Sequence, residues 1–409
     1  AGAGAGFFSQ LLLARLLGAD QLGLFYAVTS LVAVAGLLAV QGYPVITIRF
    51  AARYQSAVPL FKAFIRGAAR QTSLAVALGS SVIILAAIAY PFEQTGTRLA
   101  LIIAAAMLPF VALVNITSAI AAAARRFDIC YIPEVFVRPL VFLGAIVLLA
   151  SAGLAGSAVV FLLAFAAITA AVALVQAKLA LPLVPKGPTA AIPRRLSRCW
   201  RGEAHMAIVV ALFMTAFADV AIVMSSPLMS ASDIAVFGLS LKLSFLVGFI
   251  VQIAHHVASP DLAEARNARD QAALRRTLRK AVFWPVLATL AITIAAAVFG
   301  DELLSLFGPD FAGGGPVLAV LIGAQVVIAL AGPSVTMLTL SGAQRENAIL
   351  CALALGTLGL ADLVLIPAFG ALGAAIAVLV ATVIWQVAVL ATLRRRGEAR
   401  TDCLALLRS

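Results

Sequence analysis

Five ionisable side chains interrupt otherwise apolar stretches of this chain, and their chemistry is the most informative in the sequence. They are Arg15, Arg138, Asp219, Lys242 and Asp362. An ionised group inside a membrane span costs roughly 2.5 to 3.5 kcal/mol on insertion scales, so it usually faces a water-filled cavity or a partner. The basic members can bind anions such as phosphate. The acidic members can pair with a base or bind a coupling cation.

Asp219 and Lys242 are expected to lie at matching depths in two neighbouring antiparallel helices. At a rise of 1.5 Å per residue, both lie about 12 to 14 Å from the same membrane edge. Two interpretations stay open. The two residues form an ion pair that only neutralises two buried charges, or Lys242 lines a cavity and Asp219 holds it in place.

Arg15 lies near the outer end of the first apolar stretch. A guanidinium can bind phosphate oxygens through two parallel hydrogen bonds, which makes Arg15 a candidate phosphate ligand. The alternative is an arginine that reaches to the membrane interface. Arg49 and Arg138, near the inner ends of their stretches, are further substrate-binding candidates, although interfacial anchoring explains both. Asp362 is the candidate ion-coupling residue; the alternative is a buried acid bonded to a helix hydroxyl.

Other kinds of chemistry find little support in the sequence. The four cysteines and three histidines, including His255 and His256, show no metal-ligand spacing, so no metal site is expected. The glycine-rich FAGGGP that begins at Phe311 is not followed by Lys-Ser/Thr, and so is not a P-loop. No paired acids or Ser/His/Asp set offers catalysis. We therefore expect no cofactor and no enzymatic activity.

The composition points to a lipid environment. Hydrophobic residues make up 63% of the 409 residues and charged residues only 11%, whereas soluble domains have about 45–50% and about 25%. Long Ala- and Leu-rich runs favour helices over a membrane β-barrel, which predicts an all-α membrane protein. The net charge of +12 is dispersed between the apolar runs, so no nucleic-acid partner is expected.

The apolar runs predict about twelve transmembrane helices, because each approaches or exceeds the ~20 residues that cross a bilayer. Pro109, Pro139, Pro285 and Pro333 lie within them and are expected to kink them. The predicted spans are Ala1–Leu17, Leu22–Ile48, Thr72–Tyr90, Leu99–Ala123, Ile132–Ala150, Leu154–Ala177, His205–Ser225, Ile234–Val257, Ala281–Phe299, Pro316–Leu340, Ala348–Ile366 and Ala371–Leu393.

The positive charges predict the orientation of these spans. Of the 29 Lys and Arg residues, all but Arg15, Arg98 and Lys242 lie on one set of alternate connections. Basic loops stay in the cytoplasm, so both termini are expected there. The opposite connections carry acids instead: Asp20, Glu93, Asp233, Asp301, Glu302 and Asp310.

The chain also resembles a duplication. The segments DQLGLFYAVTSLVAVAGLL, from Asp20, and DIAVFGLSLKLSFLVGFI, from Asp233, both start with an outer acid and continue into a basic inner loop. Two parallel six-helix repeats would place the substrate site between them. The predicted division is an N-terminal lobe at 1–180, a basic cytoplasmic linker at 181–203, a C-terminal lobe at 204–393 and a cytoplasmic tail at 394–409.

Four segments carry a family resemblance: LARLLGADQLGLFYAV (Leu13–Val28), the stretch Asp219–Lys280, DELLSLFGPDFAGGGPVL (Asp301–Leu318) and GALGAAIAVLVATVIWQ (Gly370–Gln386). Together they resemble the polysaccharide (O-antigen-type) flippases of the multidrug/oligosaccharidyl-lipid/polysaccharide exporter superfamily. The related lipid II flippases have two more helices than the twelve predicted here.

The resemblance implies a MATE-like fold of two pseudo-symmetric six-helix lobes around a cavity that Arg15 faces. It implies a bacterial inner-membrane protein that moves undecaprenyl-diphosphate-linked oligosaccharides for surface polysaccharide synthesis. Its partners would be the anionic lipid-linked oligosaccharide, membrane lipids and the polysaccharide assembly machinery. A drug or toxic-cation exporter and a lipid II-type flippase are the alternatives. A cation exporter needs unpaired acids in its cavity, and the predicted N-terminal lobe has none deep in its spans.

Overall fold

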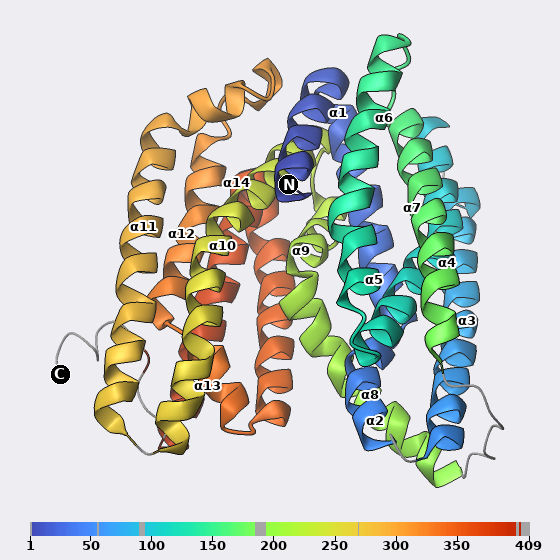
Figure 1. Cartoon of the computed structure of the whole chain (residues 1–409). Coiled ribbons are helices and arrows are strands. Elements are labelled where there is room, and N and C mark those ends of the chain that lie inside the picture. The colour runs from blue at the N-terminus through green and yellow to red at the C-terminus, as the bar shows by residue number, and fades with distance from the viewer. Residues whose placement is uncertain are drawn as a thin grey trace. The chain divides into compact units, whose positions relative to one another are not determined.

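Every regular element in the described part of the chain is a helix, and this confirms the predicted all-α class (Figure 1). The computed structural model describes residues 2–54, 57–89, 95–184, 194–268, 270–397 and 401. Glu93, Cys403, residues 185–193 of the expected linker and most of the expected tail lie outside these ranges.

The long helices are α1 (Gly2–Ala39), α2 (Tyr43–Arg53), α3 (Val58–Ala89), α4 (Thr95–Ala123), α6 (Arg138–Ser151), α7 (Ala158–Ala180), α8 (Arg194–Thr215), α9 (Phe217–Ser225), α10 (Ala231–Asn267), α11 (Gln271–Ser305), α12 (Gly315–Ala331) and α14 (Gln344–Arg395).

The remaining elements are short and join the long helices. They are α5 (Phe127–Tyr131), the π-helical η1 (Ile132–Val137), α13 (Ser334–Leu340), and three 3₁₀ turns, η2 (Leu181–Leu183), η3 (Ser226–Leu228) and η4 (Pro309–Phe311). Among the described residues, eight helices are long and apolar enough to cross a membrane. The number rises to ten when α8–α9, bent by 86°, and α12–α13, bent by 47°, each count as one span.

Helix α1 contains the first of two chain reversals inside a nominally continuous helix. Gly18 has φ 69° and ψ 177°, a left-handed backbone that suits glycine. The Tyr26 hydroxyl donates to Gln10 Oε1 at 2.5 Å. Sixteen residues of straight helix would separate these side chains by about 24 Å, so the chain doubles back near Gly18. The predicted first and second spans lie on either side of it.

Helix α14 reverses in the same manner at Gly370, which has φ 53° and ψ −130°. A Cβ on Gly373 would lie 2.2 Å from the carbonyl oxygen of Leu365, although eight residues of straight helix would separate the two by about 12 Å. Added to the ten candidate spans, the two reversals give twelve segments in the described part of the chain, as the sequence predicts.

Several helices extend far beyond the apolar stretch that predicts them. The span expected from Thr72 belongs to α3, which begins at Val58 and includes Lys62 and Arg66. The same holds for α10, which ends at Asn267 instead of Val257. Hydropathy indicates where a helix contacts lipid, but it does not indicate where the helix ends. A prediction from hydropathy therefore assigns the basic extensions of these helices to loops.

The seventh predicted span, His205–Ser225, is wrong as a straight helix. The chain bends by 86° between α8 and α9, next to Ala216. No proline or glycine lies at this break, so nothing in the local sequence predicts it. The tenth span also breaks, between α12 and α13, but there Gly332 and Pro333 supply the expected signal.

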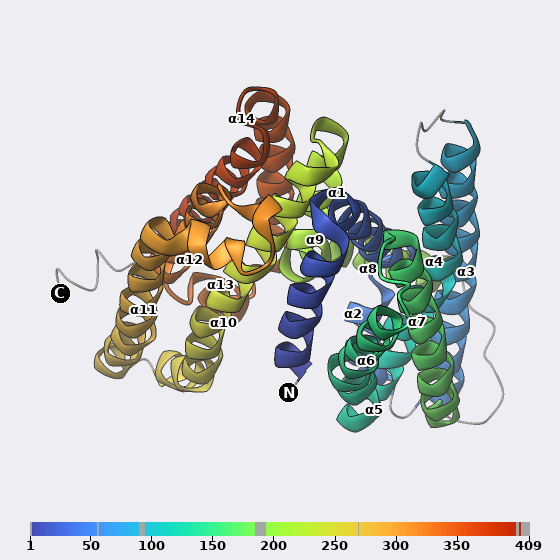
Figure 2. The same cartoon turned by 90° about the horizontal axis from the view of Figure 1, so that it is seen from above.

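Contacts between helices divide the chain into Ala1–Val223 and Met224–Ser409. In the first unit, α4 lies between α3 and α7 (Figure 2). An aromatic cluster holds the start of α8 in this unit: Trp200 packs on Phe64 with ring centroids 5.3 Å apart, and its Nε1 donates to the Tyr54 hydroxyl at 3.1 Å. The predicted lobes at 1–180 and 204–393 differ from this division and stay a prediction.

The second unit is built from α10, α11, α12 and both arms of α14. Asp301 near the end of α11 accepts a 2.8 Å hydrogen bond from the backbone N–H of Gly315 at the start of α12. This contact joins the two helices at their shared end. Gln325 of α12 approaches Gly248 of α10, where the absence of a side chain leaves room for its amide.

The reversal in α14 predicts an unequal response to two glycine substitutions in one helix. Gly373→Ala places a methyl group against the Leu365 carbonyl, whereas a Cβ on Gly356 meets nothing within 4 Å. We expect Gly373→Ala to cost about 1 to 3 kcal/mol, the usual range for overpacking, and Gly356→Ala to cost little. Thermal unfolding of the detergent-solubilised protein measures both. Equal midpoints for the two variants would contradict the reversal.

Candidate functional site

Asp219 lies in the first turn of α9, directly after the bend, and not in the middle of a continuous helix. The side chain is half-buried, and its Oδ1 accepts a 2.8 Å hydrogen bond from the hydroxyl of Ser30, a fully buried residue of α1. A carboxylate in the first turn of a helix also interacts favourably with the helix dipole. Two polar contacts therefore offset the cost of this charge, and the sequence indicated neither of them.

Lys242 lies on α10 and is half-buried. The hydroxyl-bearing residues two positions before and after it, Ser240 and Ser244, are fully buried. Lys242 belongs to the second unit and Asp219 to the first. The pairing of the two charges that the sequence indicates stays a prediction.

Arg15 is exposed on α1, three residues before the reversal at Gly18. Its neighbours Leu13 and Ala14 are buried against the rest of the first unit. The helix thus packs through its apolar side and leaves the guanidinium accessible within a membrane-spanning segment. This accessibility agrees with both sequence interpretations, a phosphate ligand and an interfacial anchor.

Arg49 contributes to the contact between α2 and α8. Its Nη2 bonds to Glu203 Oε2, and its guanidinium lies 5.7 Å from the ring centroid of Phe50. Glu203 is on α8, 154 residues along the chain, so sequence reasoning could not identify it as the partner. The geometry favours an anchoring role for Arg49.

Arg138 likewise has partners within the first unit. Its Nη2 lies 3.5 Å from Glu134 Oε1, and its guanidinium lies 5.6 Å from the ring centroid of Phe165 on α7. The ion pair and the cation–π contact both tie the start of α6 to its neighbours. These contacts favour an anchoring role here too.

Asp362 is the most deeply buried of the six candidates, with only 2% of its surface exposed. It lies in the first arm of α14, and its Oδ2 has no hydrogen-bond partner among the described residues. The alternative interpretation, an acid bonded to a helix hydroxyl, is not seen at this oxygen. A buried carboxylate without a partner is costly unless it is neutral or holds a cation. Among the described residues, no group of three or more His, Cys, Asp or Glu side chains is arranged so that it could hold a metal ion.

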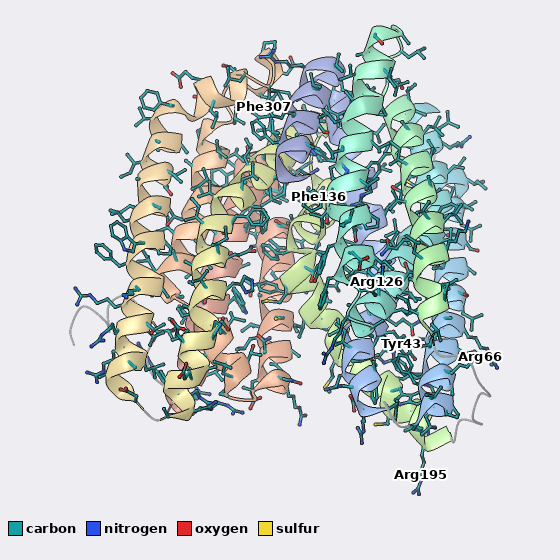
Figure 3. All side chains as sticks on the ribbon, viewed as in Figure 1. Tyr43, Arg66, Arg126, Phe136, Arg195 and Phe307 are labelled. Atoms are coloured by element: carbon teal, nitrogen blue, oxygen red, sulfur yellow. The ribbon has the colours of Figure 1, made fainter. Side chains whose placement is uncertain are left out.

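Basic residues gather at one end of the first unit. Figure 3 shows Arg66 of α3 in the lower half of the first unit and Arg195 of α8 at its lower tip. Both lie on segments that the charge pattern predicts to reach the cytoplasm. The Arg49–Glu203 pair and the aromatic cluster around Trp200 connect the same helices.

The sequence matches no protein-family model, and no curated protein matches it either. Solved structures do match over nearly the whole chain. A structure described as "Lipid II flippase MurJ, inward closed conformation" superposes with a TM-score of 0.72 at 13% identity, covering 96% of this chain and 86% of that one.

Two further structures share the fold. An inward-facing multidrug resistance MATE family transporter has a TM-score of 0.68 at 15% identity, with 100% of this chain and 95% of that chain covered. A transporter of the same MOP superfamily from Pyrococcus furiosus, described as having a binding pocket of reverse polarity, has a TM-score of 0.59 at 15% identity over 97% and 92%. The MATE-like prediction is thereby confirmed: the chain has the helical fold seen in MurJ and in MATE transporters.

Proposed function

We propose that this chain is a bacterial inner-membrane flippase that moves undecaprenyl-diphosphate-linked oligosaccharides outward by alternating access, for surface polysaccharide synthesis. Three things support the proposal: the fold, the four sequence segments that resemble polysaccharide flippases, and the accessible guanidinium of Arg15. Arg15 carries the argument, because it is an exposed cation among the buried apolar residues Leu13, Ala14 and Leu17 of α1.

The chemistry of Arg15 suits a diphosphate. A planar guanidinium offers paired donors that match phosphate oxygens, and it stays protonated at any physiological pH. In a cavity of reduced dielectric, the attraction between the two charges is stronger than in water. The cost of holding a cation within a membrane span is offset whenever the anionic headgroup is bound.

The membrane potential and a coupled ion are the proposed energy sources. Moving one negative charge outward gains up to about 2.3 kcal/mol per 100 mV. Asp362, whose Oδ2 has no hydrogen-bond partner within the described ranges, is the residue we assign to ion coupling. Asp219, at a helix break of the kind that forms binding sites in transporters, is assigned together with Lys242 to substrate movement. Arg49 and Arg138 keep only a supporting role, because their contacts are structural.

Location follows from the charge pattern. The basic connections would face the cytoplasm, with both termini on that side. The substrate headgroup would then enter from the cytoplasm while its lipid tail stays in the bilayer. Polysaccharide assembly enzymes on the outer side are the expected recipients of the translocated unit.

Two other functions belong to the same fold. The MurJ likeness favours a lipid II-type flippase, and the MATE likeness favours a cation exporter. For a cation exporter, the buried Asp362 would be the cation ligand, whereas Asp219 of the first unit accepts a hydrogen bond from Ser30. Two assays distinguish the polysaccharide flippase from the two alternatives. A lipid II-type flippase would rescue a strain depleted of its lipid II flippase, and a cation exporter would give resistance to ethidium in a strain that lacks drug exporters. Rescue or resistance, without surface glycan export, would contradict our proposal.

Substitution of Arg15 tests the phosphate-binding role. We expect Arg15→Ala to reduce surface glycan export by at least roughly tenfold, the loss that about 1.4 kcal/mol of binding energy produces. Arg15→Lys should rescue poorly, because lysine keeps the charge but loses the bidentate geometry. The readout is surface polysaccharide per cell at equal protein level. Arg98→Ala, which removes another exposed arginine of the first unit, is the matched control. Full export by Arg15→Ala would leave Arg15 as an anchor.

The contact between Ser30 and Asp219 predicts energetic coupling. A hydrogen bond to a charged group contributes about 1.5 to 3 kcal/mol, so Ser30→Ala and Asp219→Ala, each of which removes the bond, should be non-additive in a double-mutant cycle. Unfolding in mixed micelles, followed by circular dichroism, gives the free energies. Thr29→Ala is the control, because the Thr29 hydroxyl donates to carbonyls of its own helix. Additive effects of Ser30→Ala and Asp219→Ala would show that the hydrogen bond contributes nothing to stability.

A further inference from the structure

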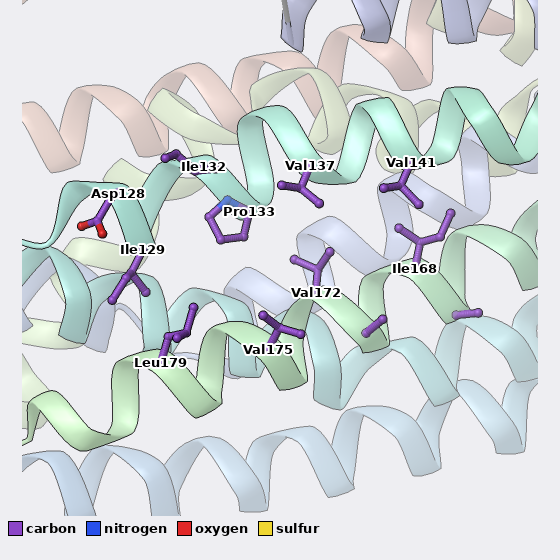
Figure 4. Close-up of a pocket in the computed structure, with 12 residues that line it drawn as sticks. Asp128, Ile129, Ile132, Pro133, Val137, Val141, Ile168, Val172, Val175 and Leu179 are labelled. Atoms are coloured by element: carbon purple, nitrogen blue, oxygen red, sulfur yellow. The ribbon is translucent and has the colours of Figure 1, made fainter.

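An apolar groove runs along the first unit between α7 on one side and α5, η1 and α6 on the other (Figure 4). Its volume is about 660 Å³, and Asp128 is the only charged residue among those that line it. Several lining side chains are largely exposed, including Val175 at 57% and Leu179 at 48%. These exposed apolar positions belong to candidate membrane spans, so the groove presents a surface suited to contact with hydrocarbon.

The groove exists because α7 does not pack closely against the segment formed by α5, η1 and α6. The wide π-helical turn η1, Ile132–Val137, interrupts the regular spacing between α5 and α6. Opposite it, α7 presents the small side chains of Ala167 and Ala171. Such π-helical turns are rare in proteins, and those that occur often lie at functional sites. Together these features leave a channel for a linear apolar chain.

The length of the groove matches one leaflet of a bilayer. Its lining residues on α7 extend from Ala167 to Leu179, about 18 Å at the helical rise of 1.5 Å per residue. Half of the roughly 30 Å hydrocarbon core is about 15 Å. A single acyl chain that lies along one leaflet therefore fits, whereas a much longer polyprenyl tail would leave most of its length outside.

One end of the groove is polar and basic. Arg126 donates to both carboxylate oxygens of Asp128, at 2.9 and 2.7 Å. Ile129 and Ala180 belong to one buried cluster, which places the end of α7, with Lys178, beside α5. Arg125 and Lys178 are exposed, and neither has an ion pair with another described residue. Three cations and one carboxylate thus leave a net positive end that complements a phosphate.

We propose that this groove binds one acyl chain of an anionic phospholipid, whose headgroup phosphate lies against Arg125 and Lys178. The basic end is the end that the charge pattern assigns to the cytoplasm, so the lipid belongs to the inner leaflet. The site is separate from the substrate-translocation role proposed above and does not depend on it. A bound phospholipid fills the channel that η1 opens and ties α6 to α7.

Native mass spectrometry of the full chain in detergent, with one defined lipid added at a time, measures the affinity of the first bound lipid. We expect phosphatidylglycerol to bind roughly tenfold tighter than phosphatidylcholine with the same chains, because basic residues near the headgroup attract anionic lipids. Ala171→Phe fills the groove and should weaken phosphatidylglycerol binding at least fivefold. Leu174→Phe, on an exposed position of α7 that does not line the groove, should change nothing.

The double variant Arg125→Gln/Lys178→Gln tests the headgroup contact at the surface, where folding is not at risk. It should lower the affinity for phosphatidylglycerol to that for phosphatidylcholine. Equal binding of the two lipids by the unaltered protein would overturn the proposal, as would unchanged binding by Ala171→Phe. Competition by glycerol 3-phosphate would show an anion site without a chain. Tighter, Ala171-dependent binding of a polyprenyl phosphate would assign the groove to the transported lipid instead.

Discussion

Hydrocarbon cannot form hydrogen bonds, so every peptide group of this chain that enters the membrane has to find its partner inside the protein. Continuous helices meet this demand by themselves, and interrupted helices need help. The break between α12 and α13 receives it from a side chain and from the local backbone. The Thr401 hydroxyl donates to the carbonyl oxygen of Ala331 at the end of α12, and the backbone N–H of Ser334 donates to the carbonyl oxygen of Gly332 at 2.7 Å. These bonds give partners to peptide groups beside the break.

The same absence of water governs the charged side chains. Two of the ionisable groups in spans have contacts that offset their charge: Asp219 with Ser30 and a helix N-terminus, and Arg138 with Glu134 and an aromatic ring. Asp362 differs, because its buried Oδ2 lacks a hydrogen-bond partner among the described residues, and stability alone does not explain it. That difference is the physical ground for giving Asp362 the ion-coupling role. Arg15 is given its role for another reason, which is that its side chain is exposed on α1 and can be reached by a headgroup.

Lipid is therefore the solvent that shapes this protein and also the chemical class on which we propose that it acts. The two proposed lipid sites make different demands. A transported headgroup needs a cation that can bind and release it, which suits an accessible arginine such as Arg15. A resident phospholipid needs a channel of fixed shape, and the groove beside η1 has small alanines on one wall and a wide turn on the other.

The sequence by itself determined the class of protein, the approximate number of spans and the short list of charged candidates. Composition and hydropathy suffice for these, because the cost of exposing polar groups to hydrocarbon depends on residue type and not on topology. Helix ends were harder, since α3 and α10 continue past the lipid as basic helices that hydropathy assigns to loops.

The tertiary structure decided which charges have partners and where the chain bends. Glu203 lies 154 residues from Arg49, and Asp219 lies 189 residues from Ser30. No local pattern encodes contacts of that separation. The bend beside Ala216 has no glycine or proline to announce it, and the groove depends on a π-helical turn that faces two alanines of another helix. Such features arise from how neighbouring helices pack, and packing is a property of the folded chain that residue types at single positions do not specify.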